Sequence, residues 1–430
     1  MRKHSLIILF AVMLIALLLG GCASAVTPAA TTAPAPVKPN LTGKTIKVYG
    51  MTDLSGPTAT TTASVAAGAK DMIAYINETG GIFGAKLELQ FEDTALKVDQ
   101  AVAIFDRWTS QDKNIVIALI FGTPEQQALK DRIKQSKVPT MGAGPDFVAL
   151  YGVKDGWQFA SAPLWDEQLS YFMDYVVANW ARIKPAKAGD KVKLAYLSWS
   201  TALGQAALTD ASKAYLKNLG VEIVSTELYE SNPKADTTTA ILNAQAAGAN
   251  VVWNNTAGFG IANLLNDMKK LGVRDQFVVG TAMLGMDIAT YAFLADKANA
   301  DGLYGTMAYA WWSDADNPAI KLANELATKY NTPANLKSFG RIIAQAQLDI
   351  ARKALEDAIL KVGYDNLNGQ AVYDALTALK GYKPLGGLTT VDFTGGARAG
   401  RQLQIRQIQG GPDKFVVIKD FALAPDFRPK

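Results

Sequence analysis

The sequence has very few of the side chains on which many catalytic mechanisms depend. Its 430 residues include one cysteine, Cys22, and one histidine, His4, both close to the N-terminus. Without further thiols or imidazoles, the rest of the chain cannot form a Ser-His-Asp or Cys-His nucleophile, a zinc site of cysteine and histidine ligands, or a disulfide. We therefore predict no catalytic residues of these types, no metal site and no cofactor.

A strong excess of charge of one sign is also lacking. The sequence has 43 basic and 39 acidic residues, which gives a formal net charge of +4 at pH 7. Because this excess is small, the sequence offers no electrostatic reason to expect a nucleic acid partner. Hydrophobic residues make up 49% of the chain, which is ordinary for a globular protein of two or three domains.

The N-terminus has the three parts of a secretory signal. A cationic start at residues 2–3 precedes an apolar run over residues 6–19, and two glycines follow at 20–21. The run is shorter than the roughly 20 apolar residues of a membrane-spanning helix. The string LLGGC at 18–22 resembles a bacterial lipobox, in which cleavage precedes a cysteine that carries diacylglycerol.

These features predict export followed by lipid anchoring. Residues 1–21 are expected to be removed as a signal peptide, and Cys22 to attach the mature chain to the membrane. A free thiol is the alternative, but the only cysteine of the chain stands at the one position that a lipoprotein requires. Residues 22–43 include a stretch rich in proline and threonine and are predicted to form a disordered linker. The expected location is extracytoplasmic.

Downstream of the linker, short apolar runs alternate with segments of helical periodicity. Residues 45–51 and 86–92 are predicted strands, and apolar side chains between them recur on one helical face. The wholly apolar run 115–121 indicates a strand that is buried on both faces. A second series of the same kind starts near Lys193. Strands that alternate with helices are typical of parallel sheets, so we predict two α/β lobes.

Three motifs and the order of the elements carry a resemblance to a known family. The motifs are DLSGPTA at 53–59, INETGGIFGAKLEL at 76–89 with Asp93 just beyond, and VPTMGAGP at 138–145. They resemble the periplasmic leucine/isoleucine/valine-binding proteins of ABC importers, and the resemblance covers residues 44–430. It implies the fold of periplasmic binding protein type I, with two Rossmann-like lobes joined by a three-segment hinge.

The resemblance also implies that the chain leaves the first lobe and later returns to it. Lobe 1 is expected to contain residues 44–163 and 310–385, and lobe 2 residues 164–306 and 389–430. The three crossings are expected near residues 162–165, 306–311 and 383–388.

Such an architecture predicts a binding protein and not an enzyme. The strand ends of open α/β sheets form a crevice at which helix N-termini present free N–H groups. Two facing crevices can close on a small ligand, and a membrane transporter can then distinguish the closed, loaded protein from the open one. We expect an extracytoplasmic receptor that delivers an amino acid, an amide or a related compound, aromatic ones included, to the permease subunits of an ABC importer.

At four positions where relatives in this family bind their ligand, this sequence has a different residue. Relatives bind the α-carboxylate of an amino acid through a serine and a threonine, and Gln126 and Asp146 occupy those positions here. In the second lobe, Leu203 replaces a tyrosine and Ala282 stands at or next to an acidic residue that binds the ligand ammonium. These four differences argue against an ordinary aliphatic α-amino acid.

Aromatic and amide side chains dominate the loops that are expected to line the crevice. They suit a flat or partly apolar ligand held by a few hydrogen bonds, and Glu125 and Asp146 would suit a donor or a cation. The same two acids stand where helices begin and are equally suited to capping, and Ser55 to shaping its turn. The predicted ligand-binding residues are Ser55, Thr61, Glu125, Gln126, Gly144, Asp146, Trp165, Trp199, Asn255, Thr256, Phe259, Ala282, Met283 and Trp311.

Three other functions remain open on the sequence alone. An exported hydrolase that uses only carboxylates, as glycosidases do, is compatible with the lack of histidine. Its candidate acids would be Glu125 and Asp146, which are expected in the same lobe and not in facing loops. The second is that the protein senses a ligand as the partner of a membrane receptor, and the third is that it is a structural lipoprotein of the cell surface.

Overall fold

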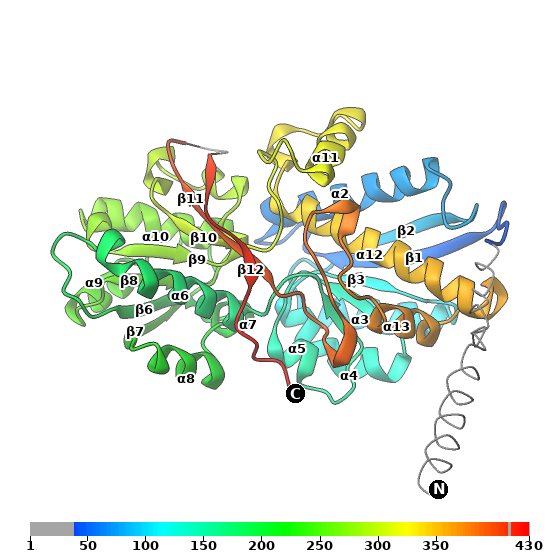
Figure 1. Ribbon diagram of the computed structural model, residues 1–430, viewed down its shortest axis with the longest axis horizontal. Helices are drawn as coiled ribbons and strands as arrows, with labels where there is room; N and C mark the ends of the chain where they lie inside the picture. Colours follow the sequence, from blue (N-terminus) through cyan, green and yellow to red (C-terminus); the bar gives the residue numbers. More distant parts are fainter. Residues whose placement is uncertain (1–37, 412–413, 430) are drawn as a thin grey trace, which may run out of the picture. The chain divides into compact units, whose positions relative to one another are not determined.

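The chain is organised around two β-sheets whose strands are connected by helices (Figure 1). The computed structural model describes residues 38–411 and 414–429. The expected signal peptide, the lipidation site Cys22 and most of the expected linker lie outside the described residues. We call the five-stranded sheet with its helices lobe 1, and the seven-stranded sheet with its helices lobe 2. Both belong to one compact unit over residues 39–430.

Lobe 1 is built on a fully parallel sheet with the strand order β2-β1-β3-β4-β5. The two long strands pair in register from Thr45 opposite Lys86 to Thr52 opposite Asp93. The strands are β1 (Thr45–Thr52), β2 (Lys86–Asp93), β3 (Ala118–Ile120), β4 (Thr140–Gly142) and β5 (Gln158–Ala160). Its helices are α2 (Ala59–Glu78), α3 (Val98–Gln111), α4 (Thr123–Ser136), α5 (Phe147–Tyr151), α11 (Pro318–Lys329), α12 (Phe339–Val362) and α13 (Gly369–Thr377).

Lobe 2 has the strand order β12-β11-β10-β9-β8-β6-β7, in which β11 and β12 run antiparallel to their neighbours. The strands are β6 (Lys193–Trp199), β7 (Glu222–Tyr229), β8 (Val251–Asn254), β9 (Val278–Thr281), β10 (Tyr304–Met307), β11 (Gln402–Ile408) and β12 (Phe415–Leu423). Its helices are α6 (Trp165–Ile183), α7 (Ala202–Gln205), α8 (Asp210–Asn218), α9 (Thr238–Ala246) and α10 (Gly258–Lys270). The predicted α/β fold of two lobes is confirmed.

Short 3-10 helices occur in the connections of both lobes. They are η1 (Arg274–Gln276), η2 (Met283–Gly285), η3 (Ile288–Ala292), η4 (Lys297–Ala300), η5 (Ala334–Leu336), η6 (Tyr364–Asn366), η7 (Pro384–Gly386) and η8 (Thr394–Gly396). In the part of the chain that the structure describes, no helix combines the length and the apolar character that a membrane span requires.

The chain crosses between the lobes three times. The first crossing lies between β5 and α6, and the second between β10 and α11. The third differs from the expected position at 383–388. After that point Val391 still pairs with Tyr382, and Ala399 pairs with Ala160 of β5, so the chain joins the sheet of lobe 2 only at Gln402. These isolated bridges keep the segment on lobe 1 beyond the residues where the sequence suggested a crossing.

Helices α2 and α12 pack closely in lobe 1, and their N-terminal turns reach the region between the lobes. At Gly68 of α2 the two backbones are close, since a Cβ atom there would lie 2.8 Å from both the Cα and the carbonyl oxygen of Arg341 on α12. The Arg341 side chain is buried and forms an ion pair with Asp71 of α2. Glycine at this position therefore sets how close the two helices lie.

We predict that Gly68→Ala destabilises the protein by about 1–3 kcal/mol, because backbone atoms of α12 cannot move aside as a flexible side chain could. Helix propensity alone would make the alanine variant more stable by about 1 kcal/mol. A decrease in the free energy of unfolding would therefore come from the close packing. Urea unfolding measures the change. Gly189→Ala is the control, since a Cβ atom there has no neighbour within 4 Å. Equal stability of Gly68→Ala and the wild type would contradict the close contact.

Candidate functional site

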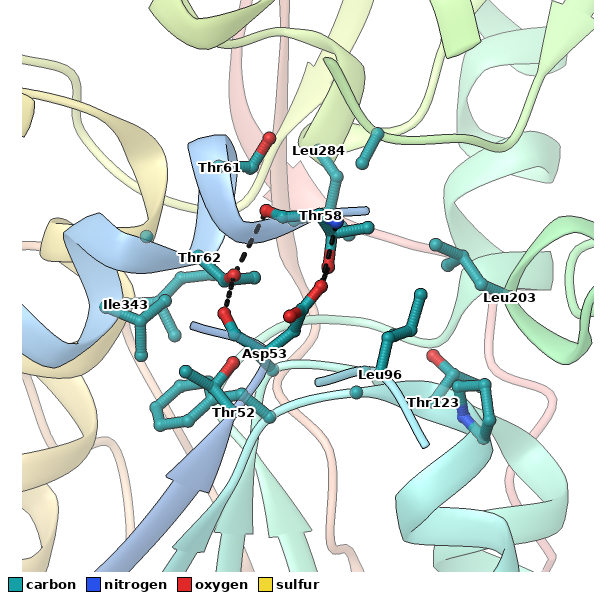
Figure 2. Close-up of a pocket in the computed structure, with 18 of the residues that line it drawn as sticks. Thr52, Asp53, Thr58, Thr61, Thr62, Leu96, Thr123, Leu203, Leu284 and Ile343 are labelled. Atoms are coloured by element: carbon teal, nitrogen blue, oxygen red, sulfur yellow. Dashed lines mark hydrogen bonds between the residues drawn. The ribbon is translucent and has the colours of Figure 1, made fainter. Parts of the chain in front are cut away.

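A cavity lies between the lobes, at the ends of strands from both sheets (Figure 2). Its volume is about 110 Å³. Residues that follow β1, β3, β4, β6 and β9 line it, together with the first turns of α2 and α12, so the carboxyl edges of both parallel sheets contribute. The residues from lobe 2 are Trp199, Thr201, Leu203, Ser231, Ala257, Leu284 and Asp287.

The lining is mainly apolar and hydroxylic. Figure 2 shows Leu96, Leu203 and Leu284 around the same space, with Ile343 of α12 on the opposite side. The other large apolar residues of the lining are Val65, Phe121, Trp199 and Phe339, and its threonines are Thr52, Thr58, Thr61, Thr62, Thr123 and Thr201. Asp53 and Asp287 are acidic, and no lysine, arginine or histidine of the described residues lines the cavity.

Asp53 holds the turn between β1 and α2. Its carboxylate accepts hydrogen bonds from the backbone N–H of Gly56 (2.5 Å), from the backbone N–H of Thr58 (2.8 Å) and from the Thr58 hydroxyl (2.7 Å). A Cβ atom at Gly56 would lie 2.6 Å from the Ala95 carbonyl oxygen, so the turn also requires glycine. The predicted contact Ser55 is exposed and donates to Asp93 (2.5 Å), which fits its alternative role in shaping this turn.

Asp287 links elements of the two lobes. In lobe 2 its carboxylate caps η3 by accepting a hydrogen bond from the backbone N–H of Ala289 (2.6 Å). The same carboxylate accepts from the backbone N–H of Phe339, the first residue of α12 in lobe 1. The residue is 1% exposed. One buried carboxylate therefore satisfies backbone donors of both lobes at the edge of the cavity.

Glu125 lies at the beginning of α4, where Gly122 and Pro124 start the helix. Its carboxyl group is fully buried against Gly122, a cavity residue at which a Cβ atom would overlap that group. Thr94 donates to Oε1 (3.4 Å), and Oε2 has no hydrogen-bond partner among the described residues. Burial raises the pKa of Glu125 to about 7.

Thr61, Gly144 and Trp199 are the predicted ligand-binding residues that line the cavity. Thr61 comes from the first turn of α2, Gly144 follows β4, and Trp199 ends β6. Trp199 packs on Phe259, with 4.7 Å between the ring centroids, so the predicted contact Phe259 supports this wall from behind the lining.

The predicted residues Gln126 and Asp146 of lobe 1, and Trp165 at the start of lobe 2, lie outside the lining and have partners within the protein. Asp146 caps α5 by accepting from the backbone N–H of Ala149 (2.9 Å), and also accepts from Gln127 (2.8 Å). The Gln126 amide donates to the Ile120 carbonyl oxygen (2.7 Å). Trp165, at the start of α6, is fully buried and donates to the Thr123 hydroxyl (3.4 Å).

The remaining predicted residues are also buried outside the lining. Asn255 donates to the Leu203 carbonyl oxygen (2.6 Å), and Thr256 donates to Asn254. The backbone N–H groups of Ala282 and Met283 donate to Asn254 (3.2 Å) and Gln168 (3.2 Å). Trp311 stacks on Phe415 of β12, with 4.9 Å between the ring centroids.

Several lining residues were not among the predicted contacts. Asp53 and Thr58 stand inside the DLSGPTA motif, whose turn geometry was the available signal. Leu284 and Asp287 follow β9, in the same loop as the predicted contacts Ala282 and Met283. Phe339 and Ile343 belong to a helix far along the chain, and no local pattern connects them with the site. A ligand site assembled from two lobes is only partly visible in sequence.

Two parallel-rich sheets with a cavity between their strand ends define a two-lobed solute-binding architecture. The sequence model of one family, periplasmic binding protein, matches residues 45–412. The chain belongs to this family, as its three motifs predicted.

Individual relatives agree with this assignment. The chain is 26% identical over 310 residues to a Leu/Ile/Val-binding protein homolog 3 of Brucella melitensis, over 71% of this chain and 77% of the relative. A branched-chain amino acid ABC transporter structure from Thermus thermophilus with bound valine is similar with a TM-score of 0.78 and 20% identity, over 89% and 98% of the two chains. The structure of a fatty acid ABC transporter substrate-binding protein from Thermomonospora curvata is similar with a TM-score of 0.74 and 20% identity, over 90% of this chain and 94% of that chain.

Burial of carboxyl groups predicts how stability depends on pH. Burial raises the pKa of Glu125 from 4.5 to about 7, and that of Glu167 from 4.5 to about 8. At a pH between the ordinary and the raised pKa of such a group, the folded protein holds a proton that the unfolded chain releases. The free energy of unfolding therefore falls as pH rises through this range. For Glu125 alone the loss is on the order of 3 kcal/mol.

We therefore predict that stability, measured by urea unfolding, decreases from about pH 5 to about pH 8. Glu125→Gln should reduce this decrease, because an amide carries no titrating proton. Glu88→Gln is the matched control on exposed β2 surface of the same lobe and should leave the decrease unchanged. An unaltered pH dependence in Glu125→Gln would show that this carboxyl group is not the source.

Proposed function

We propose that this protein is an extracytoplasmic receptor that captures a small molecule between its lobes and delivers it to an ABC importer. The observation that carries the proposal is a single cavity lined from both lobes, at the strand ends where α/β sheets bind ligands. The relatives support it, since the Thermus and Thermomonospora structures are named as proteins of ABC transporters.

The contacts between the lobes suggest how ligand binding would be signalled. Helix α4 of lobe 1 contacts α7 of lobe 2, and the Thr61 hydroxyl lies close to Gly258 at the start of α10, where a Cβ atom would be 3.3 Å away. A ligand in the cavity touches both walls only when the lobes are close, so it stabilises the closed form by those differential contacts. The permease would recognise that closed form.

We expect a bound ligand to raise the melting temperature and to reduce the radius of gyration in small-angle scattering. The probes are a panel of amino acids, primary amides, alcohols and aromatic acids, guided by native mass spectrometry of any ligand that co-purifies. Leu203→Trp, which fills the cavity from α7, should weaken binding by about tenfold or more. Leu242→Trp, on the exposed surface of α9 in the same lobe, should not.

Two results would contradict the receptor function. One is a folded protein that responds to no member of the panel and keeps its scattering profile. The other is saturable turnover of a glycoside or an ester, which would favour a hydrolase that uses carboxylates. The hydrogen bonds of Asp53 and Asp287 to backbone donors fit a structural use of these two acids in the receptor.

We also propose that Cys22 anchors the receptor to the membrane through a lipid, on the basis of the LLGGC string. Cys22→Ala should move the protein from the membrane fraction to the soluble fraction, measured by ultracentrifugation and immunoblotting. Ser24→Ala, two residues further along, is the control and should stay with the membranes. If Cys22→Ala also stays with the membranes, the anchor is not at this cysteine.

A further inference from the structure

We propose that the ligand of the interlobe cavity is an uncharged molecule with a compact apolar body and a hydroxyl, carbonyl or amide group, and not a carboxylate or an amino acid zwitterion. The inference rests on the proposed receptor function and specifies its substrate class. Four features of the site carry it. They are the absence of a cation in the described lining, the acids of the protein at the surrounding helix starts, the hydrogen bonds that Asp53 and Asp287 accept from the backbone, and the size and walls of the cavity.

A carboxylate buried in this cavity would have no cationic partner. No lysine, arginine or histidine lines the cavity within the described residues, and the only charged side chains there are the acids Asp53 and Asp287. Burying an ionised group without an opposite charge is costly, and like charges nearby add repulsion. Relatives hold an α-carboxylate through hydroxyl groups, but the hydroxyls of Thr58 and Thr62 already donate to Asp53 in this chain. The hydroxyls of the other lining threonines can donate to or accept from a neutral polar group.

The helix starts at the cavity, which would otherwise attract an anion, already have acidic groups of the protein beside them. Asp287 accepts from the first N–H of α12, and Asp53 accepts from Thr58, immediately before α2. Glu125 is buried against Gly122 at the start of α4. The partial positive charge of these N-termini therefore faces carboxyl groups of the chain itself.

The same hydrogen bonds argue against a cationic ligand. Each oxygen of the Asp53 carboxylate accepts from a backbone N–H, with the Thr58 hydroxyl as a further donor. Each oxygen of Asp287 likewise accepts from a backbone N–H, one in each lobe. An ammonium group would have to compete with these donors, so neither acid is set up as an open site for a cation.

The size and the walls of the cavity define the apolar part of the ligand. A volume of about 110 Å³ is somewhat smaller than the ~150 Å³ of an engineered apolar cavity that binds benzene. Leu96, Leu203, Leu284 and Ile343 surround the space (Figure 2). A branched chain of about five carbons or a single aromatic ring matches this volume and these walls.

Two series of probes with a constant body and a variable head group test the inference on the wild-type protein. The first contains 3-methylbutanamide, 3-methylbutanol, 3-methylbutanoate, 3-methylbutylamine and L-leucine. The second contains benzamide, benzyl alcohol, benzoate and benzylamine. Isothermal titration calorimetry at about pH 7 gives the affinities. In at least one series an uncharged member should bind about tenfold or more tightly than every charged member.

Tighter binding of a carboxylate, an amine or leucine than of the uncharged members would overturn the inference while leaving the receptor function supported. Binding of no probe in either series at about 10 mM would also overturn it. The receptor function itself is contradicted only if the wider panel fails as well, so the two failures are distinguishable.

A variant tests the contribution of one acid. At about pH 8, above the pKa of Glu125, Glu125→Ala should raise the affinity for 3-methylbutanoate or benzoate by about fivefold or more, because it removes an ionised carboxyl group from the N-terminus of α4. Affinity for the uncharged members should change by less than about twofold. Glu88→Ala, exposed on β2, controls for the change in net charge and should have no effect. An unchanged carboxylate affinity in Glu125→Ala would overturn the role of this acid in excluding anions.

Discussion

The interaction on which the site depends is the hydrogen bond from the backbone N–H of Phe339 to the carboxylate of Asp287. A helix start needs acceptors for its free N–H groups, and here the acceptor of α12 comes from the other lobe. Because α12 is packed against α2 at Gly68, this hydrogen bond connects a loop of lobe 2 to the helix pair that forms one wall of the cavity. The two lobes therefore meet at this carboxylate, beside the cavity.

In this arrangement the acids that line the site bind groups of the protein itself. Asp53 and Asp287 satisfy backbone donors, and the space between them is lined by leucine, threonine and aromatic side chains. Selection of a ligand then depends on shape and on a few hydroxyl groups, because apolar contacts contribute in proportion to the area that they bury. The hydrogen bond that connects the lobes thus also engages a lining acid, which leaves the apolar walls and the hydroxyl groups to recognise an uncharged ligand.

The sequence predicted the framework well because the framework repeats a local pattern. The predicted strands at 45–51 and 86–92 correspond to β1 (Thr45–Thr52) and β2 (Lys86–Asp93). Burial alternates over the first three residues of each strand, and β1 is then buried throughout from Val48 to Thr52. The third crossing was placed too early because single bridges such as Tyr382–Val391 have no periodicity. The hydrogen bond between Asp287 and Phe339 spans 52 residues and two lobes, so no local signal could indicate it.

Acidic residues show most clearly what a sequence leaves undetermined. Both Glu125 and Asp146 were compatible with ligand contact or with capping, because an acid near a helix start suits either role. Their surroundings decide between the roles: Asp146 is engaged by Ala149 and Gln127, while Glu125 is enclosed beside Gly122 with one oxygen unpaired. A fold depends on many small contributions and survives extensive substitution, whereas ligand chemistry depends on the burial of a few groups. Two proteins of one family can therefore share the lobes and differ in the charge of the ligand that they accept.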